Sequence, residues 1–495
     1  MNEEEMLFFC SLTPEMATRL DSVLQRVLAN EAAFPRSQAH HAWECRLDLL
    51  DSLPEFLVAN PMRQQWMATY RSVEHGGAGL KHLRNSLGWK RRLEALSQGA
   101  QWLDLECDEG HLKEKIDTAR GKGAKTVLSG HYFEDPPDWD HVLSQYEEGQ
   151  PDVIKIICMG HSFADFKTQR RLYAQSKLPL VHFFMGEEFQ STRLLSMIYG
   201  APFTFVASSS GSAVAPGQLT DRACACLLPD AVNEPLHLYA IAGYPVSHSR
   251  SPAFHQPLLR QVHPNVFYLK FPIQNQQELA EAWRLFPELM GMSVTKPVKE
   301  AAAALSSGHQ LQACNTLVRQ NRGLTGMNTD AEALKAILLA EKDTIQREKP
   351  VLRILGYGGV GKTAETLAHH LGFRVQLFNR TQKHLKGCHP DSEIGIWQQR
   401  QTTGCDVLLQ ATSVGMGNNT QTPMESLPEG VQSVIETIYH PRETALLKMA
   451  RTKGIRHYEG VSFFQAQAEC QSRIFLKAQR RRTFPVKPTG FPSET

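Results

Sequence analysis

Val153-Ile154-Lys155-Ile156-Ile157-Cys158 is a short apolar run, rich in β-branched residues, that contains one lysine. The run is too short to cross a membrane, and its composition predicts a buried strand. A buried ammonium group is costly, so a lysine in such a strand reaches solvent, forms an ion pair, or loses its proton. The last outcome gives a nucleophilic amine, which is the chemistry of Schiff-base enzymes. The simpler alternative is an edge strand whose lysine points to water.

Seven further apolar runs occur before residue 207, and most of the gaps between them can hold a helix, for example Pro14–Asn30 and Ser162–Gln175. Alternating strands and helices predict a parallel sheet, and this number of units predicts a (β/α)8 barrel. The predicted strands are Leu7–Leu12, Trp43–Leu49, Trp66–Arg71, Trp102–Cys107, Lys125–Ser129, Val153–Cys158, Pro179–Met185 and Phe203–Val206.

Polar residues lie where such a barrel would place its chemistry, at the C-terminal ends of the strands. Glu44 and Arg46 lie on the second run, Arg71 closes the third, His131 follows the fifth, and Gln218 lies beyond the eighth. Taken singly, each is an ordinary ion-pair, rim or loop residue. Their position on one rim together with the lysine predicts an active site.

The strings around these residues resemble type I 3-dehydroquinate dehydratase, and we assign residues 1–227 to that barrel. The matching strings are Glu44-Cys45-Arg46-Leu47-Asp48, Tyr70-Arg71-Ser72 with Gly76-Gly77, Ser129-Gly130-His131, Asp152-Val153-Ile154-Lys155-Ile156, Met185-Gly186 with Arg193, and Ala215-Pro216-Gly217-Gln218.

The resemblance implies that Lys155 forms an iminium with the ketone of 3-dehydroquinate and that His131 moves the protons. It implies that the substrate is held by Glu44, Arg46, Arg71, Arg193 and Gln218, among which the guanidinium groups suit a carboxylate. Two positions depart from the family. His75 stands where the family has a glutamate, with Glu74 one residue earlier, and Val214 stands where a serine is expected, with Ser212 nearby.

A second glycine-rich strand-to-helix segment follows the connection Leu228–Pro235. Val351–Thr363 satisfies the dinucleotide fingerprint through Gly356, Gly358 and Gly361, and it equally satisfies the Walker A pattern of nucleoside triphosphatases, which ends here in Lys362 and Thr363.

The next strand favours the dinucleotide. Arg374–Phe378 runs into Asn379-Arg380-Thr381, where a Rossmann fold reads the ribose and where an arginine indicates the 2′-phosphate of NADP. A triphosphatase needs an aspartate at the end of an apolar strand for magnesium, and Asp406 precedes its strand.

The residues between residue 238 and this loop offer a proton donor for carbonyl reduction, because a lysine beside a carboxylate can supply a proton. Lys299 and Asp330 are the candidates. The surrounding strings resemble shikimate dehydrogenase: Gly243-Tyr244-Pro245-Val246, His248-Ser249-Arg250-Ser251-Pro252, Ser293-Val294-Thr295-Lys296-Pro297-Val298-Lys299, Asn315-Thr316, Asn328-Thr329-Asp330, Ala411-Thr412-Ser413-Val414-Gly415-Met416, Tyr439-His440-Pro441, and Gly460 with Gln467.

This resemblance implies a shikimate-binding lobe at 238–330, to which a helix at 463–477 returns, a Rossmann lobe at 331–462, and a flexible tail at 478–495. The implied shikimate contacts are Ser249, Ser251, Thr295, Asn315, Asp330, Tyr439 and Gln467. The implied NADP(H) contacts are Gly356, Gly358, Gly359, Gly361, Asn379, Arg380, Thr381, Lys383, Thr412, Met416 and Gly460. Ser293, Ala331 and Glu436 replace the family's asparagine, glycine and aspartate.

The whole chain fits a cytoplasmic enzyme. It has 495 residues, 42% of them hydrophobic and 21% charged, and its net charge of +2 offers no strong field for nucleic acid or an acidic membrane. Its ten cysteines lack the spacing of a zinc site or a disulfide framework, so we expect reduced thiols and no metal. The acidic start Met1–Glu5 is unlike a targeting peptide, and no apolar run approaches the length of a membrane helix.

The two resemblances imply consecutive reactions, the dehydration of 3-dehydroquinate to 3-dehydroshikimate and its NADPH-dependent reduction to shikimate, with no obligate protein partner. Two alternatives remain open. One is a Schiff-base lyase or aldolase fused to a P-loop ATPase. The other is a catalytically weakened metabolite-binding regulator, which the departures at His75 and Val214 would favour.

Overall fold

A parallel sheet of eight strands, ordered β7-β6-β5-β4-β3-β2-β1-β8, forms the first half of the chain. The computed structural model describes residues 6–12, 39–55, 57, 65–134, 136–207, 215–220, 223–224, 236–307, 311, 313–320, 323–417 and 419–480. The predictions for Pro14–Asn30, Ser212, Val214, Leu228–Pro235 and residues 481–495 lie outside this part.

The eight predicted strands are confirmed, with shifts at their ends. They are β1 (Met6–Leu12), β2 (Ala39–Arg46), β3 (Gln65–Thr69), β4 (Trp102–Glu106), β5 (Lys125–Tyr132), β6 (Val153–Met159), β7 (Leu180–Met185) and β8 (Phe203–Val206). Between the described residues of β7 and β8 there is no strand pairing, so the barrel is nearly closed. Around it lie η1 (Val73–His75), α4 (Lys81–Leu83), η2 (Arg84–Gly88), α5 (Trp89–Ser97), α6 (Leu112–Gly121), α7 (Trp139–Glu148), α8 (Ala164–Gln175), η3 (Glu187–Phe189) and α9 (Gln190–Ile198).

Alternation along β6 decides where its lysine points. Val153 and Ile157 belong to a cluster of buried side chains inside the barrel, whereas Ile154 and Ile156 belong to the core between the strands and the helices. Successive side chains of a strand face opposite sides of the sheet. Lys155 therefore points into the barrel interior, and the edge-strand alternative is wrong.

A five-stranded sheet follows, in the order β10-β9-β11-β12-β13. Its strands are β9 (His237–Gly243), β10 (Val266–Pro272), β11 (Leu289–Val294), β12 (Thr316–Gln320) and β13 (Gly323–Met327), and its helices are α11 (Ser251–Arg260), α12 (Gln276–Leu285) and α13 (Lys299–Leu305). The last two strands form an antiparallel hairpin, while β9, β10 and β11 are parallel.

The third sheet has the order β16-β15-β14-β17-β18-β19. If its strands are numbered from its own start, the order is 3-2-1-4-5-6, which is that of a dinucleotide-binding Rossmann fold. Its elements are α14 (Thr329–Thr344), β14 (Val351–Leu355), α15 (Gly359–His370), β15 (Arg374–Phe378), η4 (Gln382–Leu385), β16 (Glu393–Gly395), η5 (Trp397–Gln399), β17 (Val407–Gln410), β18 (Ser433–Glu436), α16 (Ala445–Thr452) and β19 (Arg456–Tyr458).

The last described helix, α17 (Gly460–Arg480), leaves this sheet and packs back on the five-stranded one. Its Phe475 ring lies 5.2 Å from the ring of Tyr239 on β9. The helix continues to Arg480, which is inside the segment that the sequence assigned to a flexible tail.

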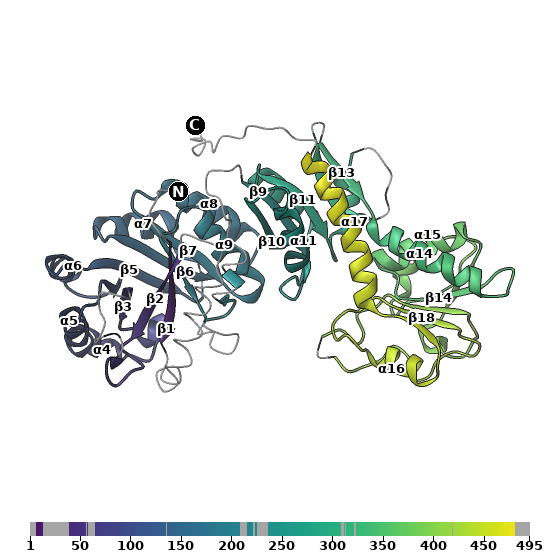
Figure 1. Cartoon of the computed structure of the whole chain (residues 1–495), viewed down its shortest axis with the longest axis horizontal. Coiled ribbons are helices and arrows are strands. Elements are labelled where there is room, and N and C mark those ends of the chain that lie inside the picture. The colour runs from purple at the N-terminus through teal and green to yellow at the C-terminus, as the bar shows by residue number, and fades with distance from the viewer. Residues whose placement is uncertain are drawn as a thin grey trace.

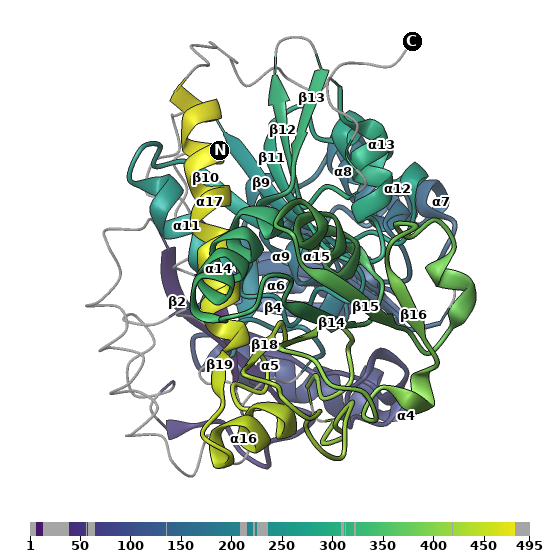
Figure 2. The same cartoon turned by 90° about the vertical axis from the view of Figure 1, so that its right-hand side faces the viewer.

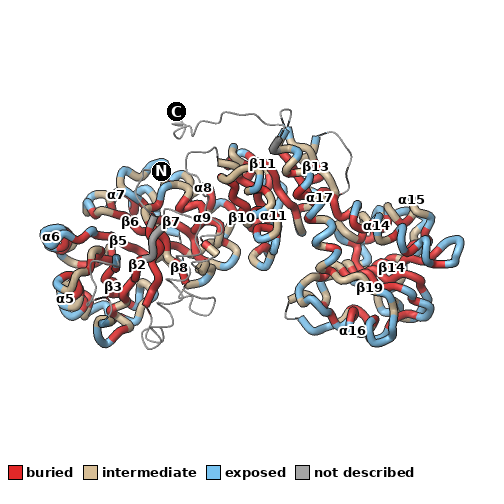
Figure 3. Tube along the Cα trace, in the orientation of Figure 1, coloured by how far each residue is buried: buried red, intermediate tan, exposed pale blue. Residues whose placement is uncertain are grey.

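The three sheets lie in a row, with the barrel at one end and the Rossmann sheet at the other (Figure 1). In the view of Figure 2 the Rossmann sheet is in front, and α17 passes next to α14, with which it is in contact. Buried segments follow the strands of all three units (Figure 3). One core joins the first two units, because Phe163 and Phe166 of the barrel belong to the same cluster of buried side chains as Phe271 and Phe286. Among the described helices, none combines the length and apolar character needed to cross a bilayer.

Candidate active sites

A pocket at the C-terminal ends of the barrel strands collects all the residues predicted for the first site. Lys155 enters it from β6, His131 from β5, Arg193 from α9 and Gln218 from the loop after β8. The remaining predicted residues, Glu44, Arg46 and Arg71, also line it. His131 lies within β5 rather than after it, because the strand continues to Tyr132.

Lys155 is 3% exposed and ion-paired, with its Nζ 2.9 Å from Oδ2 of Asp104 on β4. Asp104 also accepts hydrogen bonds from Arg71 Nη2 at 2.8 Å and from Ser129 Oγ at 2.7 Å. Burial lowers the pKa of Lys155, Asp104 opposes this, and the charge of Arg71 lowers it further. The buried amine is thus easier to deprotonate than an ordinary lysine, which is what a Schiff-base nucleophile requires.

The imidazole of His131 is suited to act as a base. In the β5–β6 pairing, Ser129 lies opposite Lys155 and His131 lies opposite Ile157. His131 is therefore the diagonal neighbour of Lys155, and both side chains face the same side of the sheet. Burial lowers the pKa of His131 well below its usual value, and the nearby charges of Arg71 and Lys155 act in the same direction. A neutral imidazole beside the lysine can accept a proton.

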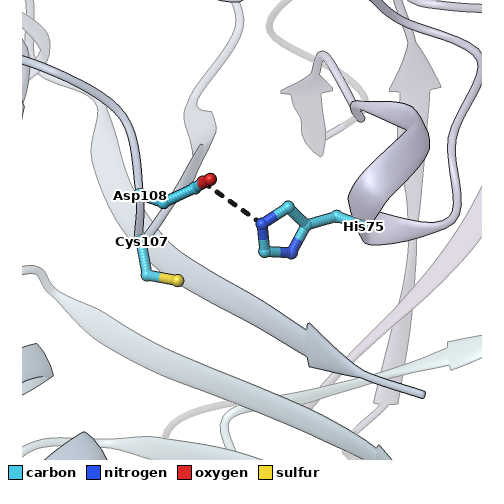
Figure 4. A group of neighbouring side chains, drawn as sticks. All are labelled: His75, Cys107 and Asp108. Carbon is cyan, nitrogen blue, oxygen red and sulfur yellow. Dashed lines mark hydrogen bonds and ion pairs between the residues drawn. The ribbon is translucent and has the colours of Figure 1, made fainter. Parts of the chain in front are cut away.

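His75, which departs from the family's glutamate, connects the backbone of His131 to the carboxylate of Asp108. His75 Nδ1 accepts a hydrogen bond from the backbone N–H of His131 at 3.2 Å, and its Nε2 lies 3.2 Å from Asp108 Oδ1 (Figure 4). The two imidazoles meet edge to face with ring centroids 5.9 Å apart. His75 therefore holds the backbone of His131.

His75, Cys107 and Asp108 offer three possible metal-ligand atoms within 4.8 Å of one another (Figure 4). Arg84 Nη1 already lies 2.6 Å from the Asp108 oxygen that faces His75, and Lys81 lies 3.0 Å from the other oxygen. Burial raises the pKa of the Cys107 thiol, so it does not supply a ready thiolate. The group suits an ion-pair network better than a metal ion.

The carboxylates on β4 were not among the residues predicted from the sequence. Asp104 and Glu106 are fully buried. Asp104 forms an ion pair with Arg71 at 2.8 Å, and Glu106 forms one with Arg84 at 2.6 Å. The signal was present, because two acids alternate on one strand and share the inward face with Trp102.

Arg193 is a buried guanidinium with unused hydrogen-bonding capacity. It lies 4.1 Å above the ring of Phe183 and donates to the Pro216 carbonyl at 3.4 Å, while its Nε has no partner among the described residues. Burial lowers its pKa to about 10. Arg193 lines the pocket and has no carboxylate partner in the part of the chain that the structure describes, so this buried cation is suited to bind an anionic ligand.

A larger pocket lies between the five-stranded sheet and the Rossmann sheet. Lys299 and Asp330 face each other in it, with Nζ and Oδ2 2.5 Å apart. Both residues stand at the start of a helix, α13 and α14 respectively. Of the other predicted residues, those that line this pocket are Ser249, Ser251, Thr295, Asn315, Gly358, Gly359, Thr412, Met416, Tyr439 and Gln467.

Polar groups in the wall of this pocket are connected by hydrogen bonds to one another and to groups behind it. Asn315 Nδ2 donates to Thr329 Oγ1 at 2.9 Å, and Gln467 Oε1 lies 3.4 Å from the same nitrogen. Ser293 Oγ donates to Gln471 Oε1 at 2.8 Å and contacts the Tyr268 hydroxyl. The substitution at Ser293 therefore leaves its polar atom satisfied.

The glycine loop makes a tight turn in which the backbone packs closely on itself. Gly356 has a φ of +95°, and a Cβ at Gly361 would lie 2.2 Å from the Gly356 carbonyl oxygen. Asn379 Oδ1 accepts from the backbone N–H of Tyr357 at 3.2 Å, which ties the loop to the end of β15. Lys362 is ion-paired with Glu300 on α13, 2.5 Å away, and together with the strand order this counts against the P-loop alternative.

Some predicted cofactor residues do not line the pocket itself. Gly356 and Gly361 shape the loop, and Asn379, Arg380, Thr381 and Lys383 follow β15, where Arg380 is exposed. Gly460 has a packing role, because a Cβ there would lie 2.0 Å from the carbonyl oxygen of Ile438.

Comparison with known proteins matches two parts of the chain to two families. A sequence model of the family Type I 3-dehydroquinase matches residues 25–227, and one described as Shikimate dehydrogenase substrate binding domain matches residues 241–317. The NADP(+) shikimate dehydrogenase of Bacillus licheniformis is 31% identical over 255 residues, which are 47% of this chain and 88% of that protein. The chain belongs to the shikimate dehydrogenase family, with a type I 3-dehydroquinase domain before it.

Other relatives span both domains. The bifunctional 3-dehydroquinate dehydratase/shikimate dehydrogenase of Arabidopsis thaliana, a chloroplastic protein, is 26% identical over 508 residues, which cover 93% of this chain and 81% of that protein. A solved structure of the dehydroquinate dehydratase and shikimate dehydrogenase of S. pombe AroM is 19% identical, covers 96% of this chain and 98% of its own, and has a TM-score of 0.37.

In the dehydrogenase, the departure at Glu436 is absorbed locally. Its carboxylate accepts hydrogen bonds from the backbone N–H of Ile438 at 3.0 Å and from Thr444 Oγ1 at 2.8 Å. Burial raises its pKa to about 7, against these hydrogen bonds. The longer acid thus holds the turn after β18, which leads into the Tyr439 side of the pocket.

Proposed function

We propose that this chain dehydrates 3-dehydroquinate to 3-dehydroshikimate in its barrel and reduces that product to shikimate with NADPH in its second half. The observation that carries the proposal is the presence, in one chain, of a buried lysine beside a histidine and of a lysine–aspartate pair facing a dinucleotide loop. Each pair has the groups that one of two consecutive reactions needs.

In the barrel, the Nζ of Lys155 adds to the ketone carbon, and the ketone oxygen leaves as water to give an iminium. His131 removes a proton from the adjacent carbon, because the iminium takes up the electron pair as an enamine. The enamine expels the neighbouring hydroxyl group, which receives that proton and leaves as water. A second water hydrolyses the conjugated iminium, restoring the ketone and the amine.

Binding in the barrel follows from charge. Arg193 is buried, has an unused donor and lies on the pocket wall, so it binds the substrate carboxylate. Glu44, Arg46, Arg71 and Gln218 line the same pocket and contact the hydroxyl groups.

In the second pocket, NADPH supplies the hydride when bound. Lys299 donates a proton to the carbonyl oxygen as it gains electrons, and Asp330, at 2.5 Å, orients the ammonium group. Ser249, Ser251, Thr295, Asn315, Tyr439 and Gln467 bind the substrate, and Arg380 binds the 2′-phosphate. We also propose a cytoplasmic location, which the free state of the described cysteines supports.

The test supplies dehydroquinate and NADPH together and follows oxidation of the cofactor, which requires both sites. Dehydroshikimate with NADPH isolates the second site. Borohydride with dehydroquinate, followed by peptide mass mapping, should label Lys155, and a label on another residue would contradict the Schiff-base assignment. A thermal shift with MgATP but not with NADPH would instead support the triphosphatase.

A further inference from the structure

The loop that carries two of the dehydrogenase's serines is held by a carboxylate of the barrel. Glu188 lies in η3, directly after β7 of the barrel. Its Oε2 accepts the backbone N–H of Val246 at 2.7 Å, and Oε1 accepts that of Ser247 at 3.1 Å. Two consecutive backbone N–H groups thus converge on one carboxylate, an arrangement that fixes the orientation of both peptide planes.

These peptide planes lead directly into the second pocket. Ser249 donates its backbone N–H to the Val246 carbonyl at 3.0 Å, so the turn before α11 is built on the residue that Glu188 holds. Ser249 Oγ in turn accepts from the backbone N–H of Ser251 at 3.2 Å. Pro245 and His248 of the loop also line the pocket. The positions of both serine hydroxyls therefore depend on the loop conformation that Glu188 sets.

A second contact holds the same loop from β10. Lys270 Nζ donates to the Ser247 carbonyl, and its backbone N–H donates to Ser191 Oγ of α9 at 2.7 Å. Burial lowers the pKa of Lys270, and the charge of Glu188 opposes this. Two charged groups therefore hold this part of the loop. Glu188 accepts the N–H groups of Val246 and Ser247, and Lys270 donates to the Ser247 carbonyl.

The backbone around Glu188 is fixed by close packing. The neighbouring Phe189 is buried and packs on Gly160, where an added Cβ would lie 2.2 Å from its ring. Its ring lies 6.2 Å from that of Phe166, which meets Phe271 of β10 edge to face at 5.3 Å. Arg170 and Glu288 form an ion pair across the same junction at 3.2 Å. The backbone that carries Glu188 is thus fixed before any ligand binds. The Glu188 carboxylate can therefore restrict the conformations of the loop in advance, which lowers the entropy that the loop loses when substrate binds.

We propose that Glu188 is a positioning residue for substrate binding in the dehydrogenase, supplied by the dehydratase domain. The proposal rests on the function proposed above for the second pocket. It means that a residue of the barrel helps to form the shikimate-binding surface. The two catalytic units are then joined through the substrate-binding loop of the dehydrogenase.

The test compares Glu188→Ala, Glu188→Gln and the matched control Glu187→Ala, all in the full-length chain. Glu187 is the exposed neighbouring acid, and like Glu188 it acts on Lys270 through its charge. Among the described residues it makes no hydrogen bond to the loop, so its removal changes the net charge equally but leaves the acceptor of the Val246 and Ser247 N–H groups in place. Steady-state reduction of dehydroshikimate at saturating NADPH gives KM and kcat, and the dehydratase reaction of the same molecules serves as an internal control.

For Glu188→Ala we expect KM for dehydroshikimate to rise about tenfold or more, because two charge-assisted hydrogen bonds to the loop are lost. Its kcat should stay within about threefold and the dehydratase kcat/KM within about twofold of wild type, since the reacting groups are untouched. Glu188→Gln keeps one carbonyl oxygen as an acceptor and should give an intermediate KM. Glu187→Ala should match wild type.

An unchanged KM in Glu188→Ala would overturn the proposal, as would an equal loss of both activities in Glu188→Ala and Glu188→Gln, which would indicate a purely structural role. If the alanine variant does not fold, the KM of Glu188→Gln decides, and a wild-type value overturns the proposal. A wild-type chain that fails to reduce dehydroshikimate would refute the proposed function and is recognised before any variant is compared.

Discussion

Replacing Asp104 by asparagine should both destabilise the barrel and change the protonation of its nucleophile. Asp104 is 1% exposed and neutralises two buried cations, Lys155 at 2.9 Å and Arg71 at 2.8 Å. Removing one partner of a buried ion pair typically costs about 3–5 kcal/mol because the remaining charge is uncompensated. Folded domains have only about 5–15 kcal/mol of stability, so the loss should be large.

The protonation effect has a definite sign. Burial lowers the pKa of Lys155 and Asp104 opposes this, so the asparagine variant should have a still lower lysine pKa. Imine formation needs the neutral amine, and the low-pH limb of borohydride trapping should therefore move to lower pH. Urea denaturation monitored by circular dichroism measures the stability, and trapping yield against pH measures the protonation.

The control is Glu114→Gln on α6, an exposed acid whose loss should leave both measurements unchanged. The reasoning would be refuted if Asp104→Asn unfolded at the wild-type urea concentration, or if its trapping profile kept the wild-type midpoint. Either result would show that Asp104 does not compensate the buried cations as the distances indicate.

Three further predictions follow from the two sites. Lys299→Ala should lower kcat for reduction on the order of 10²–10⁴-fold, the usual range for losing a general acid, and leave the dehydratase rate unchanged in the same preparation. Arg380→Ala should raise KM for NADPH but not for NADH, since only the former has the 2′-phosphate; equal effects on both cofactors would contradict its assignment. Prolonged treatment with a metal chelator should leave dehydratase activity intact, because Arg84 and Lys81 already neutralise Asp108 beside His75; restoration by added zinc after a loss would show a metal site.

Local patterns predicted individual elements of both halves of the chain. The β-branched run around Lys155 predicted a strand, because such a pattern reflects the backbone geometry of a single element. The glycine spacing from Gly356 to Gly361 fitted two kinds of nucleotide loop, and the next strand, which runs into Arg380, favoured the dinucleotide. Every residue predicted for the barrel site lines its pocket.

The partners of these residues could not be predicted in the same way. Asp104 meets Lys155 only because β4, β5 and β6 are neighbours in the sheet, and the two residues are 51 positions apart in the chain. The role of His75 depends on Asp108, which reaches it from the loop after β4. Glu188 is an unremarkable surface acid in the sequence, and only the packing of η3 against β10 brings it to Val246. Such contacts depend on how elements are assembled and leave no periodic pattern.

The aromatic cluster of Phe163, Phe166, Phe271 and Phe286 lies within one continuous core that spans the barrel and the five-stranded sheet. Separating the two enzymes at the connection between them would expose apolar aromatic rings of each fragment to water. Each piece would then tend to aggregate, and heating the intact chain should melt both units in a single transition. The two enzymes therefore depend on one shared interior.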